Sequence, residues 1–170
     1  GNILPQDFTL TATAKHVDFF CPEGYAIPAG EEGYDASGFF TRYIHFVTRG
    51  KPILWLEFGK SVVGRTDRYF YPDREDLERQ AEYIEQYYRM VLEAGANGVA
   101  PWWWPGGYRV KEQSDYGIIN PDGTPRPAGE LMGEYSDRIR MPREYPEPES
   151  WITVDRDAHP GGYWHITFNE

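Results

Sequence analysis

The sequence predicts an α/β fold in which helices cover a parallel sheet. Three short apolar runs, at 16–21, 52–58 and 98–104, alternate with longer stretches of helical periodicity, and the connections are short. Continuous apolar runs are typical of strands buried on both faces, and alternating strands and helices indicate parallel pairing. No apolar run approaches the roughly 20 residues that a membrane-spanning helix needs.

The central run is Lys-Pro-Ile-Leu-Trp-Leu-Glu-Phe-Gly, from Lys51 to Gly59. Pro52 opens the run, and its single carboxylate, Glu57, lies at the end. An ionisable group at this point belongs to the C-terminal rim of a parallel sheet, where α/β folds place their chemistry. Glu57 is therefore a candidate catalytic acid. The alternatives are a solvated loop acid or one half of an ion pair.

Three helices are expected between and after these runs. The first is predicted to begin at an N-cap on Asp35 or Ser37, since apolar residues then recur at helical spacing. The second is predicted after Asp73, a good N-cap that is followed by acidic residues and an apolar stripe of about five turns. The third begins at Pro127, a residue that is suited to a first turn. Residues 1–14 are expected to be extended or irregular.

Composition excludes several classes of function. The formal net charge of −10 disfavours binding to nucleic acid or to anionic membranes, because both require a basic surface. No glycine-rich nucleotide loop follows a strand, and Cys21, the only cysteine, leaves no intrachain disulfide. The histidines lack metal-ligand spacing, so neither metal nor cofactor is expected; they are His16, His45, His159 and His165.

These segments resemble the last three βα units of a clan A (β/α)8-barrel retaining glycoside hydrolase, a clan that includes cellulases, mannanases and β-galactosidases. Residues 51–59 resemble its seventh strand, which carries the nucleophile, and 95–104 its eighth. Residues 115–127 resemble the stretch before the final helix, and 17–25 the sixth strand. The resemblance implies strands 6 to 8 of a TIM barrel over residues 1–140.

The resemblance also implies a mechanism. Retaining enzymes use one ionised carboxylate as nucleophile and one protonated carboxyl as acid/base. Glu57 matches the nucleophile, and Tyr25 matches a tyrosine that hydrogen-bonds to it in many members. The acid/base of the clan comes from the fourth strand, which this chain lacks. The chain is therefore expected to be part of a longer or split enzyme that cleaves β-glycosidic bonds, and secretion would be usual for such an enzyme.

The tryptophans of the third run are candidate sugar platforms, since indole faces suit the apolar faces of sugars. Strand alternation predicts that Trp102 and Trp104 share one face and that Trp103 points to the other. Trp104, nearest the rim, is the preferred platform and Trp102 the second. Trp55 shares the alternation face of Glu57 and is expected in an interior layer of the barrel.

The loop behind this run carries two further acids, Glu112 and Asp115, which either bind sugar hydroxyls or are solvated. Residues 141–170 are expected to form a Pro-rich linker and a β-hairpin that leads into an accessory β-domain. Expected partners are a carbohydrate and the remainder of the barrel. Two other functions stay open: a non-catalytic carbohydrate-binding protein with a degenerate barrel, and, less favoured, a barrel isomerase or lyase.

Overall fold

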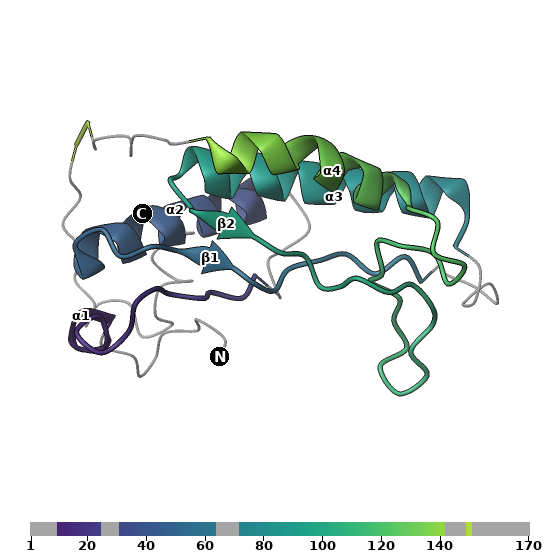
Figure 1. The fold of residues 1–170 in the computed structure, drawn as a ribbon, viewed down its shortest axis with the longest axis horizontal. Helices are drawn as coiled ribbons and strands as arrows, with labels where there is room; N and C mark the ends of the chain where they lie inside the picture. Colours follow the sequence, from purple (N-terminus) through teal and green to yellow (C-terminus); the bar gives the residue numbers. More distant parts are fainter. Residues whose placement is uncertain (1–9, 25–30, 64–71, 142–148, 151–170) are drawn as a thin grey trace.

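The computed structural model describes residues 10–24, 31–63, 72–141 and 149–150. Within these residues the chain forms four helices and a two-stranded parallel sheet. In chain order the elements are α1 (Leu10–Thr13), α2 (Glu31–Thr48), β1 (Leu54–Trp55), α3 (Arg74–Glu93), β2 (Gly98–Val99) and α4 (Pro127–Arg140). Figure 1 shows α3 and α4 side by side along one side of the strands. No helix of this described part is long and apolar enough to cross a membrane.

The parallel pairing extends beyond the two named strands. Leu54 lies opposite Gly98 and Trp55 opposite Val99. On the other side of β1, the segment 20–24 runs parallel to it, with bridges from Phe20 to Ile53 and from Glu23 to Glu57. Backbone hydrogen bonds continue to the end of each segment: the Gly24 N–H donates to the Glu57 carbonyl at 2.6 Å, and the Trp102 N–H donates to the Phe58 carbonyl at 2.8 Å. Three parallel segments therefore end at a common rim.

The helices bury one face of these segments. Trp55 is 2% exposed, its indole N–H donates to the Thr41 hydroxyl of α2, and its ring contacts Tyr87 of α3 edge-on at 5.7 Å. Phe58 is fully buried and stacks on Tyr87 at 4.0 Å. Burial raises the pKa of the Tyr87 and Tyr88 phenols above their ordinary value, which keeps both rings neutral inside the core.

Two helices match the sequence prediction closely. The α3 helix begins after Asp73, whose carboxylate accepts a hydrogen bond from the Asp76 N–H at 2.9 Å, and α4 begins at Pro127. The predicted start of α2 is wrong: the helix begins at Glu31, so neither Asp35 nor Ser37 is its N-cap. Ser37 lies within the helix, is 1% exposed, and receives a hydrogen bond from the Tyr87 hydroxyl at 3.2 Å.

The expectation of extended or irregular structure at 1–14 is wrong for α1, which forms one helical turn with Leu10 buried. The rest of that segment, residues 1–9, lies outside the described residues, as do most of the predicted linker and the whole of the predicted hairpin.

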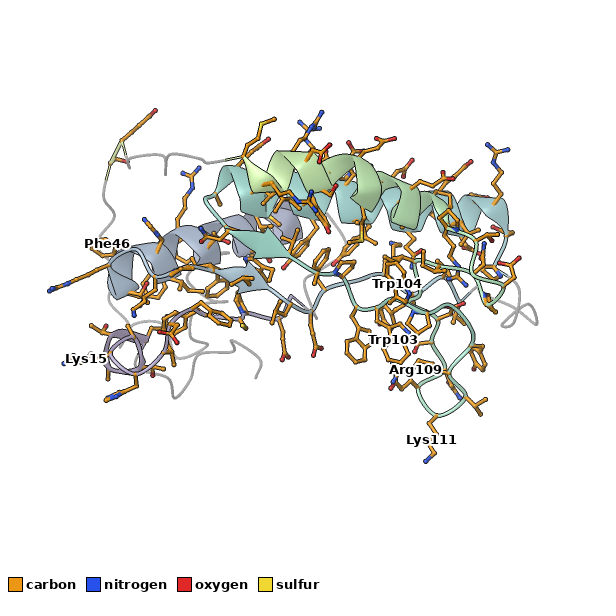
Figure 2. The ribbon with its side chains drawn as sticks, in the orientation of Figure 1. Lys15, Phe46, Trp103, Trp104, Arg109 and Lys111 are labelled. Atoms are coloured by element: carbon orange, nitrogen blue, oxygen red, sulfur yellow. The ribbon has the colours of Figure 1, made fainter. Side chains whose placement is uncertain are left out.

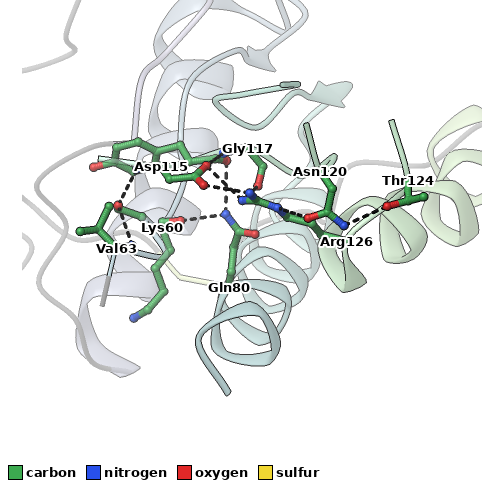
Figure 3. A network of polar contacts seen from close by, with 10 residues as sticks. Lys60, Val63, Gln80, Asp115, Gly117, Asn120, Thr124 and Arg126 are labelled. Atoms are coloured by element: carbon green, nitrogen blue, oxygen red, sulfur yellow. Dashed lines mark hydrogen bonds and ion pairs between the residues drawn. The ribbon is translucent and has the colours of Figure 1, made fainter. Parts of the chain in front are cut away.

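A buried polar network joins α3 and α4 to the loops beyond the rim (Figure 3). Arg126 donates to both carboxylate oxygens of Asp115, at 3.0 and 2.8 Å, and the two residues are 2% and 1% exposed. Gln80 of α3 is fully buried and donates to the Lys60 and Tyr116 carbonyls. The loop after β1 and the loop after β2 are thus held to the same helix.

Candidate functional site

The candidate site lies where the three parallel segments end. Glu23, Glu57 and Trp102 occupy successive positions along this rim, because Glu23 pairs with Glu57 in parallel register and Trp102 bonds to Phe58. The C-terminal ends of parallel strands are where α/β folds gather functional groups. The sequence therefore placed Glu57 at the correct end of its strand.

The side chain of Glu57 lies on the face of the sheet that the helices leave open. A Cβ on Gly24 would collide with the Tyr87 hydroxyl, so position 24 faces α3 and the preceding Glu23 faces away. Glu57, the parallel partner of Glu23, takes the same face. Both carboxylates are half-buried. Within the described part of the chain, no hydrogen bond or ion pair involves the Glu57 carboxylate.

The predicted position of Trp55 is wrong. Trp55 and Phe58 are three residues apart, yet both pack against α3. Strict alternation would place them on opposite faces, so the alternation is interrupted at Leu56 and Glu57. Trp55 therefore belongs to the layer between sheet and helices, and Glu57 does not share its face.

The tryptophans also depart from simple alternation. Trp102 and Trp103 are joined by a cis peptide bond, and their rings stack with centroids 4.8 Å apart. They therefore lie together rather than on opposite faces. Both are half-buried, whereas Trp104 is 67% exposed. The strand pattern could not reveal this pair, because the named pairing of β2 ends at Val99.

An arginine that the sequence analysis did not single out completes this cluster. The guanidinium of Arg109 lies 4.5 Å from the Trp103 ring centroid and 5.5 Å from that of Trp102 (Figure 2). Its Nη2 pairs with the Glu112 carboxylate, which also accepts a hydrogen bond from the Ser114 hydroxyl at 3.2 Å. The only sequence signal was one cation among aromatic residues in a glycine-containing loop.

The remaining candidate residues of the sequence analysis differ in burial and in whether the structure describes them. Asp115 is neither solvated nor open to a sugar, because it is buried and paired with Arg126. Glu112 is about half exposed at its side chain, and its two carboxylate oxygens contact Arg109 and Ser114. Tyr25 lies outside the described residues. Among the described side chains, no group of three or more His, Cys, Asp or Glu residues could hold a metal ion.

No protein-family model matches the sequence, and no curated protein is significantly similar to it. Solved structures do share its fold. A GH5_18 protein from Streptomyces cattleya in complex with GlcNAc superposes with a TM-score of 0.59 at 16% identity, covering 83% of this chain and 35% of its own. The GH5_18 protein from Bifidobacterium longum gives 0.58 at 16% identity, covering 85% and 36%.

A β-glucuronidase from Ruminococcus gnavus in complex with D-glucuronic acid gives a TM-score of 0.56 at 18% identity, covering 78% of this chain and 24% of its own. The chain therefore shares its fold with part of the TIM barrel of these structures. The chain spans about a third of the length of the GH5_18 structures and about a quarter of the length of the glucuronidase.

Proposed function

We propose that this chain is the C-terminal part, strands 6 to 8, of a retaining glycoside hydrolase with a (β/α)8 barrel. Residues 1–140 form this part of the barrel, and 141–170 form a linker and a hairpin that lead into a β-domain. Two observations support the proposal: three parallel segments end at one rim, and α4, which would be the last barrel helix, ends at Arg140. The rest of the barrel comes from elsewhere in the polypeptide or from a second chain.

The observation that carries the proposal is the position of Glu57. Its carboxylate lies at the rim, on the open face of the sheet, and is free of ion pairs within the described residues. An ionised carboxylate that is not neutralised by a cation is able to attack the anomeric carbon of a sugar. In the first displacement Glu57 forms a glycosyl ester while an acid on the opposite side protonates the leaving oxygen. Water then cleaves the ester, and the second residue acts as base.

In this proposal the remaining residues bind or orient the sugar. Tyr25 follows Gly24, whose backbone donates to Glu57, and its hydroxyl would donate to the nucleophile. Trp102, which stacks on Trp103, and Trp104 supply flat apolar surface, and Glu112 accepts from a sugar hydroxyl with the lone pairs that Arg109 and Ser114 leave unused. The substrate is a β-linked oligo- or polysaccharide; the similar GH5_18 structures hold GlcNAc and Manβ1-4GlcNAc.

The test uses the full-length protein that carries this chain. Incubation with an activated 2-deoxy-2-fluoro β-glycoside is expected to leave one covalent adduct per molecule, and peptide mass mapping is expected to find it on Glu57. The Glu57→Gln variant should bind sugar but neither turn over nor accept the label. Glu78→Gln, an exposed acid of α3, is the matched control and should behave as wild type.

The outcomes distinguish the candidate functions. A label on another acid would refute Glu57 as nucleophile. Sugar binding without any label would favour the second candidate, a non-catalytic carbohydrate-binding protein with a degenerate barrel. That alternative uses the same exposed Trp104 and the same stacked indole pair, so only the covalent step separates the two.

A further inference from the structure

The loop between Pro105 and Ser114 brings Arg109 next to Trp103 and carries Lys111 at its tip (Figure 2). Arg109 and Ser114 form an antiparallel bridge: the Arg109 N–H donates to the Ser114 carbonyl at 2.8 Å, and the Ser114 N–H donates in return at 3.4 Å. The turn between them includes Gln113 in the left-handed region, at φ 52°. These two hydrogen bonds therefore hold the backbone of Arg109 against that of Ser114, across the turn.

The base of this loop is anchored to the segment that follows the candidate nucleophile. The Asp115 N–H donates to the Ser61 hydroxyl at 3.0 Å, and the Val62 N–H donates to the Asp115 carbonyl at 2.8 Å. Asp115 is itself held by Arg126. The backbone of the loop that carries Arg109 is thus anchored at its base to the fold, through Asp115.

The head of Arg109 bridges the two indoles instead of extending their stack. If the guanidinium lay on the far side of Trp103, in line with the two rings, it would be about twice as far from Trp102 as from Trp103. The observed distances of 4.5 and 5.5 Å are nearly equal, so the cation contacts both rings. Its Nη1 is buried and has no hydrogen-bond acceptor within the described residues, and both indole rings lie within cation–π distance of the guanidinium.

Resting on the proposed function, we infer that Arg109 is a positioning residue that holds Trp102 and Trp103 as a preformed sugar platform. Glu112 fixes the guanidinium through Nη2, and the guanidinium fixes the rings. A platform that is ordered before the sugar arrives loses less side-chain freedom on binding. The residue acts through the indoles, so its loss should weaken sugar binding rather than the covalent chemistry at Glu57.

The experiment uses the full-length protein and two readouts. Stacked indoles give an exciton couplet in the far-ultraviolet circular dichroism, which the difference spectrum between wild type and Trp103→Phe isolates. Arg109→Ala is expected to reduce this couplet strongly and Arg109→Lys to retain part of it. Lys111→Ala, at the exposed tip of the same loop, is the matched control and should leave it unchanged.

The second readout is the reaction with the fluorinated glycoside. Arg109→Ala should raise the half-saturating concentration about 2- to 30-fold, the range that corresponds to a cation–π contact, while the limiting labelling rate changes less than twofold. A couplet that survives in Arg109→Ala would overturn the inference. So would a lost couplet with an unchanged half-saturating concentration, because the ordered pair would then not serve the sugar.

Failure of the proposed function would look different. If the wild-type protein forms no adduct, Glu57 is not a nucleophile, but Arg109 can still be judged. The couplet remains measurable, and retardation of the protein in gels containing galactomannan or hydroxyethylcellulose replaces labelling. Retardation that weakens in Arg109→Ala together with the couplet would support the inference, whereas retardation equal to that of wild type would overturn it.

Discussion

Replacing Arg126 by methionine should destabilise the protein more than any surface substitution. Arg126 is 2% exposed and uses all three of its nitrogen groups: Nη1 and Nη2 donate to the two oxygens of Asp115, Nη1 also donates to the Gly117 carbonyl at 2.8 Å, and Nε donates to the Asn120 side chain at 3.0 Å (Figure 3). Methionine fills part of the space but can donate to none of these acceptors.

The size of the destabilisation follows from the buried carboxylate that the substitution leaves without its cation. In Arg126→Met the Asp115 carboxylate stays 99% buried and, among the described residues, keeps only one donor, the Gly117 N–H at 3.0 Å. Removing one partner of a buried ion pair costs about 3–5 kcal/mol, because the other charge is left uncompensated. A domain is stable by about 5–15 kcal/mol in total, so this is a large fraction. Adding Asp115→Leu should recover part of the loss, because the uncompensated charge is then gone.

Urea denaturation of the full-length protein, followed by circular dichroism, measures these differences. Asp137→Asn is the matched control: its ion pair with Arg140 spans 4.0 Å between two exposed side chains and should contribute nothing measurable. A destabilisation by Arg126→Met of less than 1 kcal/mol would refute the reasoning. A loss that disappears between about 0.1 and 1 M salt would also refute it, since screening acts on exposed charges and little on buried ones.

Three further predictions concern packing and ionisation. On the proposed function, Gly59→Ala should reduce turnover of the full-length protein sharply in kinetic assays, because its Cβ would overlap the Trp102 carbonyl oxygen and force the rim apart; normal kinetics would count against a role of this rim in catalysis. Gly133→Ala, whose Cβ meets open space within α4, should raise the urea midpoint through a gain of about 0.5–1 kcal/mol, and an unchanged or lower midpoint would count against it. Burial raises the pKa of Tyr87 and Tyr88, so on raising the pH the unfolded protein loses these phenol protons at a lower pH than the folded protein does. Stability from these groups is complete below about pH 10 and should fall as pH rises above it, which a urea midpoint measured across this range would check.

The sequence predicted best those features whose determinants are local. The α3 helix carries its own N-cap in Asp73 and its own apolar stripe, and α4 carries Pro127 in its first turn, so both starts were predictable. The start of α2 was not, because a good N-cap residue is only a weak preference. Ser37 lies inside the helix, where a hydrogen bond from Tyr87 fifty residues away satisfies its hydroxyl.

In the candidate site, too, the features with local determinants were predictable and the others were not. The rim position of Glu57 follows from the order of strands and helices, which the apolar pattern encodes. The face of Trp55 depends on a local interruption between it and Phe58, and alternation cannot predict where a strand stops being regular. The resemblance to glycoside hydrolases supplied the fold, and the similar solved structures confirm it at the level of part of a TIM barrel.

The contact between Arg109 and the indoles was beyond sequence reasoning, because it depends on a loop conformation with no periodic signature. Gly107 and Gln113 both adopt positive φ, and the loop closes on Ser114, next to the buried Asp115. The pairing of Asp115 with Arg126 therefore stabilises the fold and also fixes where the loop returns. It follows that weakening this ion pair should disturb the exciton couplet of the indoles at urea concentrations below those that unfold the helices.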